Sequence, residues 1–440
     1  MASTYLSKSL SGSSGNQYTW TFSGWFKKAK NGSELRLLSS SDNASYDDNI
    51  RFNSDDTITI RFDNSIVLIT NRKFRDTSGY YHIVVKADTN QTSANDRIVL
   101  YINGVDERTV GGYSTNSMPG QGVSGYTNYN AFYIGVTNPS ANSNHFNGIM
   151  SHVHFTDGYA YTPSNFGETD TDTGQWKIKD NISVSYGTNG FWILKDGNSV
   201  TDQSGNSNNF TVASGTLTNT EDNPSNVFAT WNPLAQTFSS IGYEHGNTTI
   251  ATSADVGQRQ SISTLAASSG KFYMECKLQA IGSNVGGSFP YAGIVAQSKY
   301  AGNTYVGGNG CGWTTGGDVY NGGGSATSSG VSYTTGDIIG LAVDITNSKM
   351  YWHKNGTYIF SGNPSAGTGG FDISARTSED AIGFATSLYN SNGTWQCNFG
   401  NGYFGTTVVS SAGTNASGNG IFEYDCPTGF TSLSTKGLNL

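Results

Sequence analysis

The side chains most able to do chemistry in this 440-residue chain are a few carboxylates and histidines at short spacings. Glu423 and Asp425 are separated by one residue, so on a strand both would point to the same face. Two carboxylates on either side of a glycosidic bond can hydrolyse it. Cys426, Pro427 and Thr428 follow without a further Glu, and no Gly-x-Ser-x-Gly motif occurs. We therefore expect this pair to be solvated and the chain not to be an enzyme.

Calcium binding is a second chemistry that the spacings allow. Carboxylate and carbonyl oxygens are the ligands that Ca²⁺ prefers. The candidate ligands are Asp47 and Asp48 with Asn49, and Asp170 with Asp172. The competing interpretation is that these Asp and Asn residues cap turns, as they commonly do.

The histidine pair His152 and His154 is a further candidate metal site. If the alternating Val153 and Phe155 point inward, both imidazoles face solvent or a neighbouring subunit. Two histidines make only part of a site, but a homotrimer could bring such pairs together on its axis. The four cysteines contain no Cys-x-x-Cys pair, which argues against a zinc site, and Cys276 has the spacing of an inward-facing residue.

Aromatic residues in polar segments are the candidate ligand contacts. Sugars stack on exposed aromatic faces, but exposed Tyr and Trp also dominate protein interfaces, and others simply pack. The first half of the chain offers Tyr113, Tyr126 and Tyr129. The second half offers Tyr300, Tyr305, Trp313, Asp318, Tyr320 and Tyr389.

The elements that must position these side chains have the pattern of short strands. Residues 336–359 show it best: Ile339, Leu341 and Val343 alternate up to a polar turn, and Met350 and Trp352 share a face of the next strand. Asn355-Gly356 then predicts a type I′ hairpin, because both central residues of that turn need positive φ.

The same strand–turn–strand pattern recurs along the chain. Residues 18–26 put Tyr18, Trp20 and Phe22 on one face, and residues 80–105 end in Asn103-Gly104. We expect further strands at 57–63, 131–136, 148–155, 191–194, 271–278, 291–297, 381–386, 394–399 and 421–424, and a long loop-like region at 299–335. Such spacing predicts an all-β protein with two antiparallel β-sandwich (jelly-roll) domains in tandem.

Two prolines bracket a short apolar run at residues 224–233, and we place the domain boundary there. The predicted domains are residues 1–225 and 226–440. Residues 166–225 are rich in Asp, Asn and Thr, and they either complete the first sandwich or form a separate unit.

The composition excludes several classes of protein. Gly is abundant at 57 residues and charged residues make up only 13%, so helices are disfavoured and turns are many. Aromatics at 12% provide the apolar area that a disordered chain lacks. A net charge of −8 without basic clusters argues against nucleic acid as a partner. No apolar run approaches the ~20 residues of a membrane helix, so we expect no membrane insertion.

Two family resemblances follow from these segments. YLSKSLSGSSGNQYTWTFSGWFK, YHIVVKAD, RIVLYINGV and AFYIGV…FNGIMSHVHF resemble a concanavalin A-like jelly roll of the laminin-G/pentraxin type over residues 1–165. GKFYMECKL, AGIVAQ, GDIIGLAVDI, WHKNG and CNFGNGYF resemble a SPRY domain, in the expected order, over about 270–405. The first resemblance implies glycan binding and occasional Ca²⁺. The family's glucanases carry a Glu-x-Asp motif with a second Glu, which is missing after Asp425.

The pairing of these two modules looks like structural proteins of marine tailed phages. Residues 1–17 lack the apolar segment of a secretory signal, so we expect synthesis in a host cytoplasm. The predicted function is therefore that of a non-catalytic adhesion module on a virion surface, attached to capsid or tail. Its expected partners are other virion proteins and a host-surface polysaccharide. The alternatives are a purely structural capsid decoration and a glucan-active hydrolase.

Overall fold

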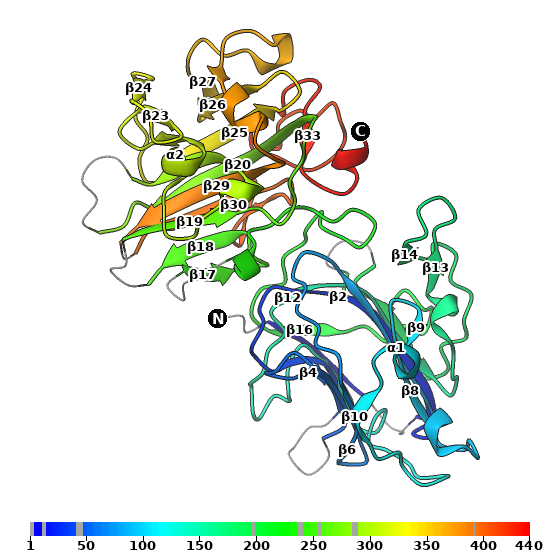
Figure 1. Ribbon diagram of the computed structural model, residues 1–440. Coiled ribbons are helices and arrows are strands. Elements are labelled where there is room, and N and C mark those ends of the chain that lie inside the picture. The colour runs from blue at the N-terminus through cyan, green and yellow to red at the C-terminus, as the bar shows by residue number, and fades with distance from the viewer. Residues whose placement is uncertain are drawn as a thin grey trace. The chain divides into compact units, whose positions relative to one another are not determined.

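The computed structural model describes residues 4–10, 15–40, 47–195, 199–235, 241–253, 257–283, 289–390 and 392–440. The chain divides into two units, Met1–Asn219 and Thr220–Leu440 (Figure 1). The predicted boundary at 225/226 lies a few residues further along the chain. No helix in the described part is long and apolar enough to cross a membrane.

The elements of the first unit are almost all strands. They are β1 (Tyr5–Ser9), β2 (Thr19–Lys28), β3 (Leu35–Ser39), β4 (Asn49–Phe52), β5 (Ile58–Phe62), β6 (Ser65–Thr70), β7 (Tyr81–Asp88), β8 (Ile98–Ile102), β9 (Val105–Asp106), α1 (Glu107–Val110), β10 (Tyr113–Asn116), β11 (Ala131–Ile134), β12 (Gly148–Asp157), β13 (Gly167–Thr169), β14 (Trp176–Ile178), β15 (Phe191–Ile193) and β16 (Thr211–Ser214).

Among the described residues, these strands form two large antiparallel sheets. One sheet has the order β10-β6-β5-β4-β3-β11-β1-β16 and the other β15-β12-β2-β7-β8-β9. Alternate residues of both sheets share one core, which contains Trp20, Phe22 and Ile60. Tyr18, which was predicted to share the strand face of Trp20 and Phe22, lies just before β2 and is 41% exposed.

The described residues of 166–219 complete the first sandwich, which answers the question that the sequence left open. β15 pairs with β12, with Val153 opposite Ile193, and so extends one sheet. β16 pairs with β1 at the edge of the other sheet. The hairpin β13–β14 forms a small separate sheet.

The second unit is also built almost entirely of strands. They are β17 (Ile241–Glu244), β18 (Thr249–Thr252), β19 (Gln258–Ile262), β20 (Lys271–Ala280), β21 (Tyr291–Ala296), β22 (Cys311–Thr314), β23 (Asp318–Asn321), β24 (Thr327–Ser328), β25 (Ile338–Asp344), β26 (Lys349–Lys354), β27 (Thr357–Tyr358), β28 (Phe371–Asp372), β29 (Ile382–Tyr389), β30 (Thr394–Asn398), β31 (Tyr403–Phe404), β32 (Thr407–Val408) and β33 (Thr431–Ser432). The short helices are α2 (Val306–Asn309) and α3 (Ser374–Thr377).

In the described part of this unit, one sheet runs β17-β18-β30-β20-β25-β26-β27 and the other β19-β29-β21-β22-β23-β24. The predicted hairpin is confirmed: Leu341 lies opposite Trp352, and Asn355 and Gly356 have φ of 48° and 86°. The indole of Trp352 crosses the core and donates to the carbonyl of Ala292 at 3.0 Å. The predicted all-β fold with two antiparallel sandwiches is therefore confirmed.

Two local predictions are wrong. Residues 299–335 contain α2, β22 and β23 and are not one long loop. β22 is only four residues long and holds one glycine, so it shows too little alternation to be recognised. Residues 421–424 form no strand, because Ile421 makes only an isolated bridge to Asn401.

The outer face of β20, β25 and β26 is closed by the C-terminal segment through one buried carboxylate. Glu275 accepts the backbone N–H groups of Glu423 and Tyr424, both at 2.8 Å. The hydroxyl of Tyr273 donates to the same carboxylate at 3.0 Å and lies 2.7 Å from Nε2 of His353. Burial raises the pKa of Glu275 to about 7, although all of these donors oppose that shift.

The His353 ring fits this layer because residue 340 has no side chain. A Cβ on Gly340 would lie 1.9 Å from Nε2 of His353, whereas a Cβ on Gly242 would meet nothing nearer than 3.8 Å. We expect Gly340→Ala to destabilise the second unit by about 3 kcal/mol and Gly242→Ala to change its stability by less than about 0.5 kcal/mol. Urea unfolding of the full chain, with hydrogen–deuterium exchange to assign the transition, measures both. Equal stability of the two variants would contradict the packing described for His353.

Candidate functional site

The loop that carries Tyr126 and Tyr129 is held by two buried carboxylates. Asp48 accepts the N–H of Tyr126 at 2.6 Å and the N–H of Thr127 at 3.1 Å. Asp157 accepts the side-chain amide of Asn128 at 2.8 Å. The rings of Tyr126 and Tyr129 lie 6.1 Å apart, and Tyr129 is 41% exposed. These two predicted residues therefore lie together on an ordered loop of the first unit.

The predicted calcium ligands are engaged by protein donors. Asp47 pairs with Arg36 at 3.3 Å and accepts the amide of Asn49 at 2.9 Å. Asp48 is 1% exposed, and burial raises its pKa despite its backbone donors. Among the described residues, no three His, Cys, Asp or Glu side chains are grouped so that they could hold a metal ion.

Asp170 and Asp172 lie in the turn between β13 and β14. The carboxylate of Asp170 accepts the N–H groups of Asp172 at 3.1 Å and Thr173 at 2.9 Å, and it pairs with Lys177 at 3.0 Å. The hydrogen bond from Lys177 is the main reason why the pKa of Asp170 is lowered. Turn capping thus accounts for this pair.

Glu168 and Asp170 form a second Glu-x-Asp pair that the sequence reasoning missed. Both carboxylates bind Lys177 on β14, at 3.7 and 3.0 Å. In the pair considered from the sequence, Glu423 accepts the N–H of Ser410 and Asp425 that of Thr414, each at 2.6 Å. These contacts give both pairs a structural role.

The two histidines do not share an exposed face, so that prediction is wrong. Val153 and Phe155 point inward as expected, but β12 has a bulge between Ser151 and His154, and His152 adopts a φ of 48°. His154 is 1% exposed, because Phe166, Tyr186 and Trp192 cover it with ring centroids 4.9–6.1 Å away. Its Nδ1 lies 2.9 Å from the hydroxyl of Tyr186.

His82 on β7 belongs to the same covered outer face. Its ring stacks on Trp25 at 4.5 Å and accepts the indole N–H of Trp176 at 2.9 Å. Its other nitrogen lies 2.9 Å from the hydroxyl of Ser23. Burial, and secondarily the nearby His152, lowers the pKa of His82 to about 3.

This lowered pKa makes the first unit acid-sensitive. Between pH 6.5 and 3 the unfolded chain binds a proton at His82 that the folded chain does not, so stability is complete above pH 6.5 and falls as the pH falls toward 3. At pH 5 we expect a loss of about 2 kcal/mol from His82 alone. His82→Gln should reduce the pH dependence of urea unfolding, and the part that remains is expected from His154, whose pKa burial also lowers. An identical pH dependence in wild type and His82→Gln would overturn this assignment.

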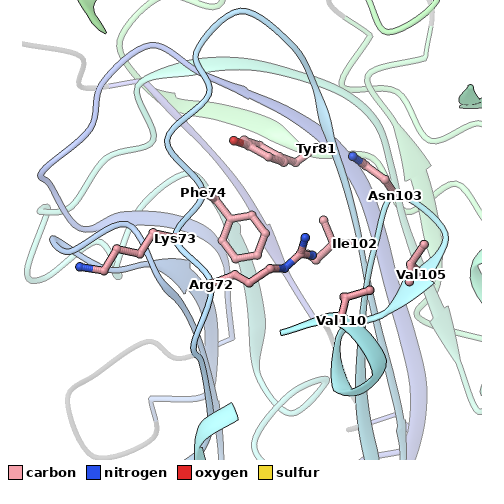
Figure 2. A pocket seen from close by; sticks show the side chains of 8 residues that line it. All are labelled: Arg72, Lys73, Phe74, Tyr81, Ile102, Asn103, Val105 and Val110. Atoms are coloured by element: carbon pink, nitrogen blue, oxygen red, sulfur yellow. The ribbon is translucent and has the colours of Figure 1, made fainter. Parts of the chain in front are cut away.

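A small pocket of about 300 Å³ lies at the end of the first sandwich where β7 begins and β8 ends. It is lined by Arg72, Lys73, Phe74, Tyr81, Ile102, Asn103, Val105 and Val110. Arg72 donates to the buried Glu107 at 2.8 Å and lies over Phe74 at 5.3 Å, whereas Lys73 extends away from the other side chains (Figure 2). None of these residues was predicted as a site residue, because they come from four separate segments.

The second unit gathers three of its six predicted residues into one aromatic cluster. Tyr305 precedes α2, Tyr320 lies on β23 and Tyr389 ends β29. Tyr291 contacts Tyr305 and Tyr320 with centroids 5.2 and 6.0 Å apart, and Phe289 stacks on Tyr389 at 5.0 Å. We call these five side chains the aromatic cluster.

The aromatic cluster lies on the outer face of the β19–β24 sheet and is only partly covered. Tyr291 is buried, and the other four side chains are half-buried. Burial raises the pKa of Tyr291, and Tyr320, Tyr305 and Asp318 raise it further. The hydroxyls of Tyr305, Tyr320 and Tyr389 have no hydrogen-bond partner among the described residues. A carboxylate beside partly exposed rings can bind the hydroxyls and the apolar face of a sugar.

Two predicted residues of this unit lie elsewhere. Trp313 on β22 is 0% exposed and its indole donates to Ser329 at 3.1 Å, so its expected loop position is wrong. Trp313 contributes to the core between the sheets. Tyr300 packs at the border of the aromatic cluster, and its hydroxyl donates to the carbonyl of Gln260 at 3.0 Å. In the first unit, Tyr113 on β10 is half-buried against the core.

Comparisons with known proteins agree with the two predicted resemblances. A family model described as the concanavalin A-like lectin/glucanases superfamily matches residues 3–165, less than half of the chain. The SPRY domain of human HERC1 is 15% identical, with 38% of this chain and 96% of that chain covered and a TM-score of 0.30. A human SPRY domain is 18% identical, with 37% and 96% covered and a TM-score of 0.28.

A sialidase of Trypanosoma rangeli in complex with the inhibitor DANA is also similar, at 14% identity, 34% and 22% coverage and a TM-score of 0.24. No curated protein matches the chain. Residues 3–165 are thus similar to the concanavalin A-like superfamily, and the second unit is an antiparallel β-sandwich. None of these similarities identifies a ligand or a partner.

Proposed function

We propose that the chain is a non-catalytic adhesion module that binds saccharide through the aromatic cluster of its second unit. The observation that carries this proposal is the convergence of Tyr305, Tyr320 and Tyr389 around Phe289 and Tyr291, because the three tyrosines come from separate segments. Asp318 lies on β23 two residues before Tyr320. Partly exposed rings supply stacking faces, and the carboxylate accepts sugar hydroxyls. The loop of Tyr126 and Tyr129 in the first unit is the second candidate contact.

The proposed location is the surface of a phage virion, as a capsid- or tail-attached appendage made in the host cytoplasm. The polar, weakly charged composition and the resemblance of the paired modules to phage structural proteins support this placement. Each site would bind weakly, and the many copies on a particle, including copies within a homotrimer, would provide avidity. The competing proposals are a structural capsid decoration and, less favoured, a glucan-active hydrolase.

A glycan array followed by calorimetry with the best glycan tests the proposal. We expect Tyr305→Ala and Tyr389→Ala each to weaken binding by about tenfold, because each removes a stacking face. Tyr159→Ala is the matched control, since Tyr159 is 42% exposed in the first unit, outside both candidate sites.

Each other outcome selects a different function. Binding to no glycan would favour the structural decoration. Loss of glycan binding in Tyr129→Ala but not in Tyr389→Ala would show that the saccharide site lies in the first unit. Release of reducing sugar from laminarin or agarose would establish hydrolysis and overturn the non-catalytic assignment.

A further inference from the structure

Two of the four cysteines lie face to face across neighbouring strands. Cys276 on β20 is directly opposite Cys397 on β30, and their Sγ atoms are 3.1 Å apart. Both side chains are 0% exposed and lie within the core between the two sheets of the second unit. Both are thiols in this structure.

The hydrogen bonds around Cys397 make Cys276 and Cys397 a non-hydrogen-bonded pair of the antiparallel ladder, the kind of pair in which the two Cα atoms lie closer together. The N–H of Cys397 donates to the carbonyl of Thr248, the residue just before β18, at 2.9 Å. In a strand, the N–H and C=O of one residue point to the same side, so Cys397 makes no ladder bonds toward β20 on its other side. At such non-hydrogen-bonded pairs the Cα atoms are about 4.5 Å apart and the side chains approach closely. That separation is within the range that a disulfide spans.

We propose that Cys276 and Cys397 are a site of disulfide formation that links β20 covalently to β30. The bond forms when the protein folds, or when its sheet opens transiently, outside a reducing cytoplasm. A low-molecular-weight disulfide such as glutathione disulfide is the oxidant. One cysteine thiolate attacks it and releases one glutathione thiolate. The second cysteine thiolate then attacks the mixed disulfide and releases the other. Two cysteine protons pass to the two released thiolates, and two electrons reduce the oxidant.

The folded sheet resists this reaction, because both sulfur atoms are shielded and the thiolate is the attacking species. Burial raises the pKa of the Cys276 thiol, and the neighbouring Cys397 raises it further. The bond therefore forms during folding or transient opening of the sheet. Cys311 and Cys426 are also buried, but no other thiol lies beside them among the described residues.

The test is refolding of the purified full chain from denaturant with glutathione disulfide, in parallel with refolding in a reducing buffer. We expect the oxidised protein to be 2 Da lighter and non-reducing peptide mapping to join the peptides of Cys276 and Cys397. We expect the melting temperature of the second unit to rise by about 10 °C, because the bond closes a loop of more than a hundred residues in the unfolded chain.

Variants separate this pair from other thiol chemistry. Cys276→Ala and Cys397→Ala should each abolish the mass change and the melting shift, whereas Cys311→Ala and Cys426→Ala should keep both. If one alanine variant fails to fold, the other variant and the peptide map of the wild type still show whether the Cys276–Cys397 disulfide forms. Four alkylatable thiols after oxidative refolding, or a disulfide between any other pair, would overturn the proposal.

Discussion

The fold depends on buried carboxylates that accept backbone N–H groups from loops distant in sequence. Asp48 binds the loop at residues 126–127, and Glu275 binds residues 423–424. Asp157 accepts the N–H groups of Asn16 and Asn189 at 2.7 and 3.0 Å. A buried N–H without an acceptor is costly, so each carboxylate specifies one position of its loop. A chain with only 13% charged residues thus uses several of them as internal anchors.

These anchors explain why long irregular segments pack onto sheets that they do not extend. Phe422 lies against Tyr273 with ring centroids 4.8 Å apart, so apolar contact accompanies the hydrogen bonds to Glu275. Trp176 covers His82 in the same way on the first unit. Each of these outer faces therefore holds a second, smaller core that contains a neutral histidine, His353 in the second unit and His82 in the first. In the aromatic cluster, by contrast, four of the five side chains are only half-buried.

Strand positions were predictable where alternation was long and turns were marked by Asn-Gly. The hairpin at Asn355-Gly356 and the inward faces of β2 and β5 follow from local rules alone. β22 was not predicted because its four residues show too little alternation, and Trp313 was therefore assigned to a loop. His154 was misplaced because a bulge and a covering segment, neither visible in the local pattern, decide its exposure.

The sequence by itself determined the all-β class, the two sandwiches and the supply of tyrosines for a surface, because these depend on period-2 patterning and composition. Only the tertiary structure decided which tyrosines meet, which carboxylates are engaged by backbone N–H groups and which two thiols oppose each other. Those outcomes depend on strand register and on how segments hundreds of residues apart cover a sheet, and local spacing carries no information about either.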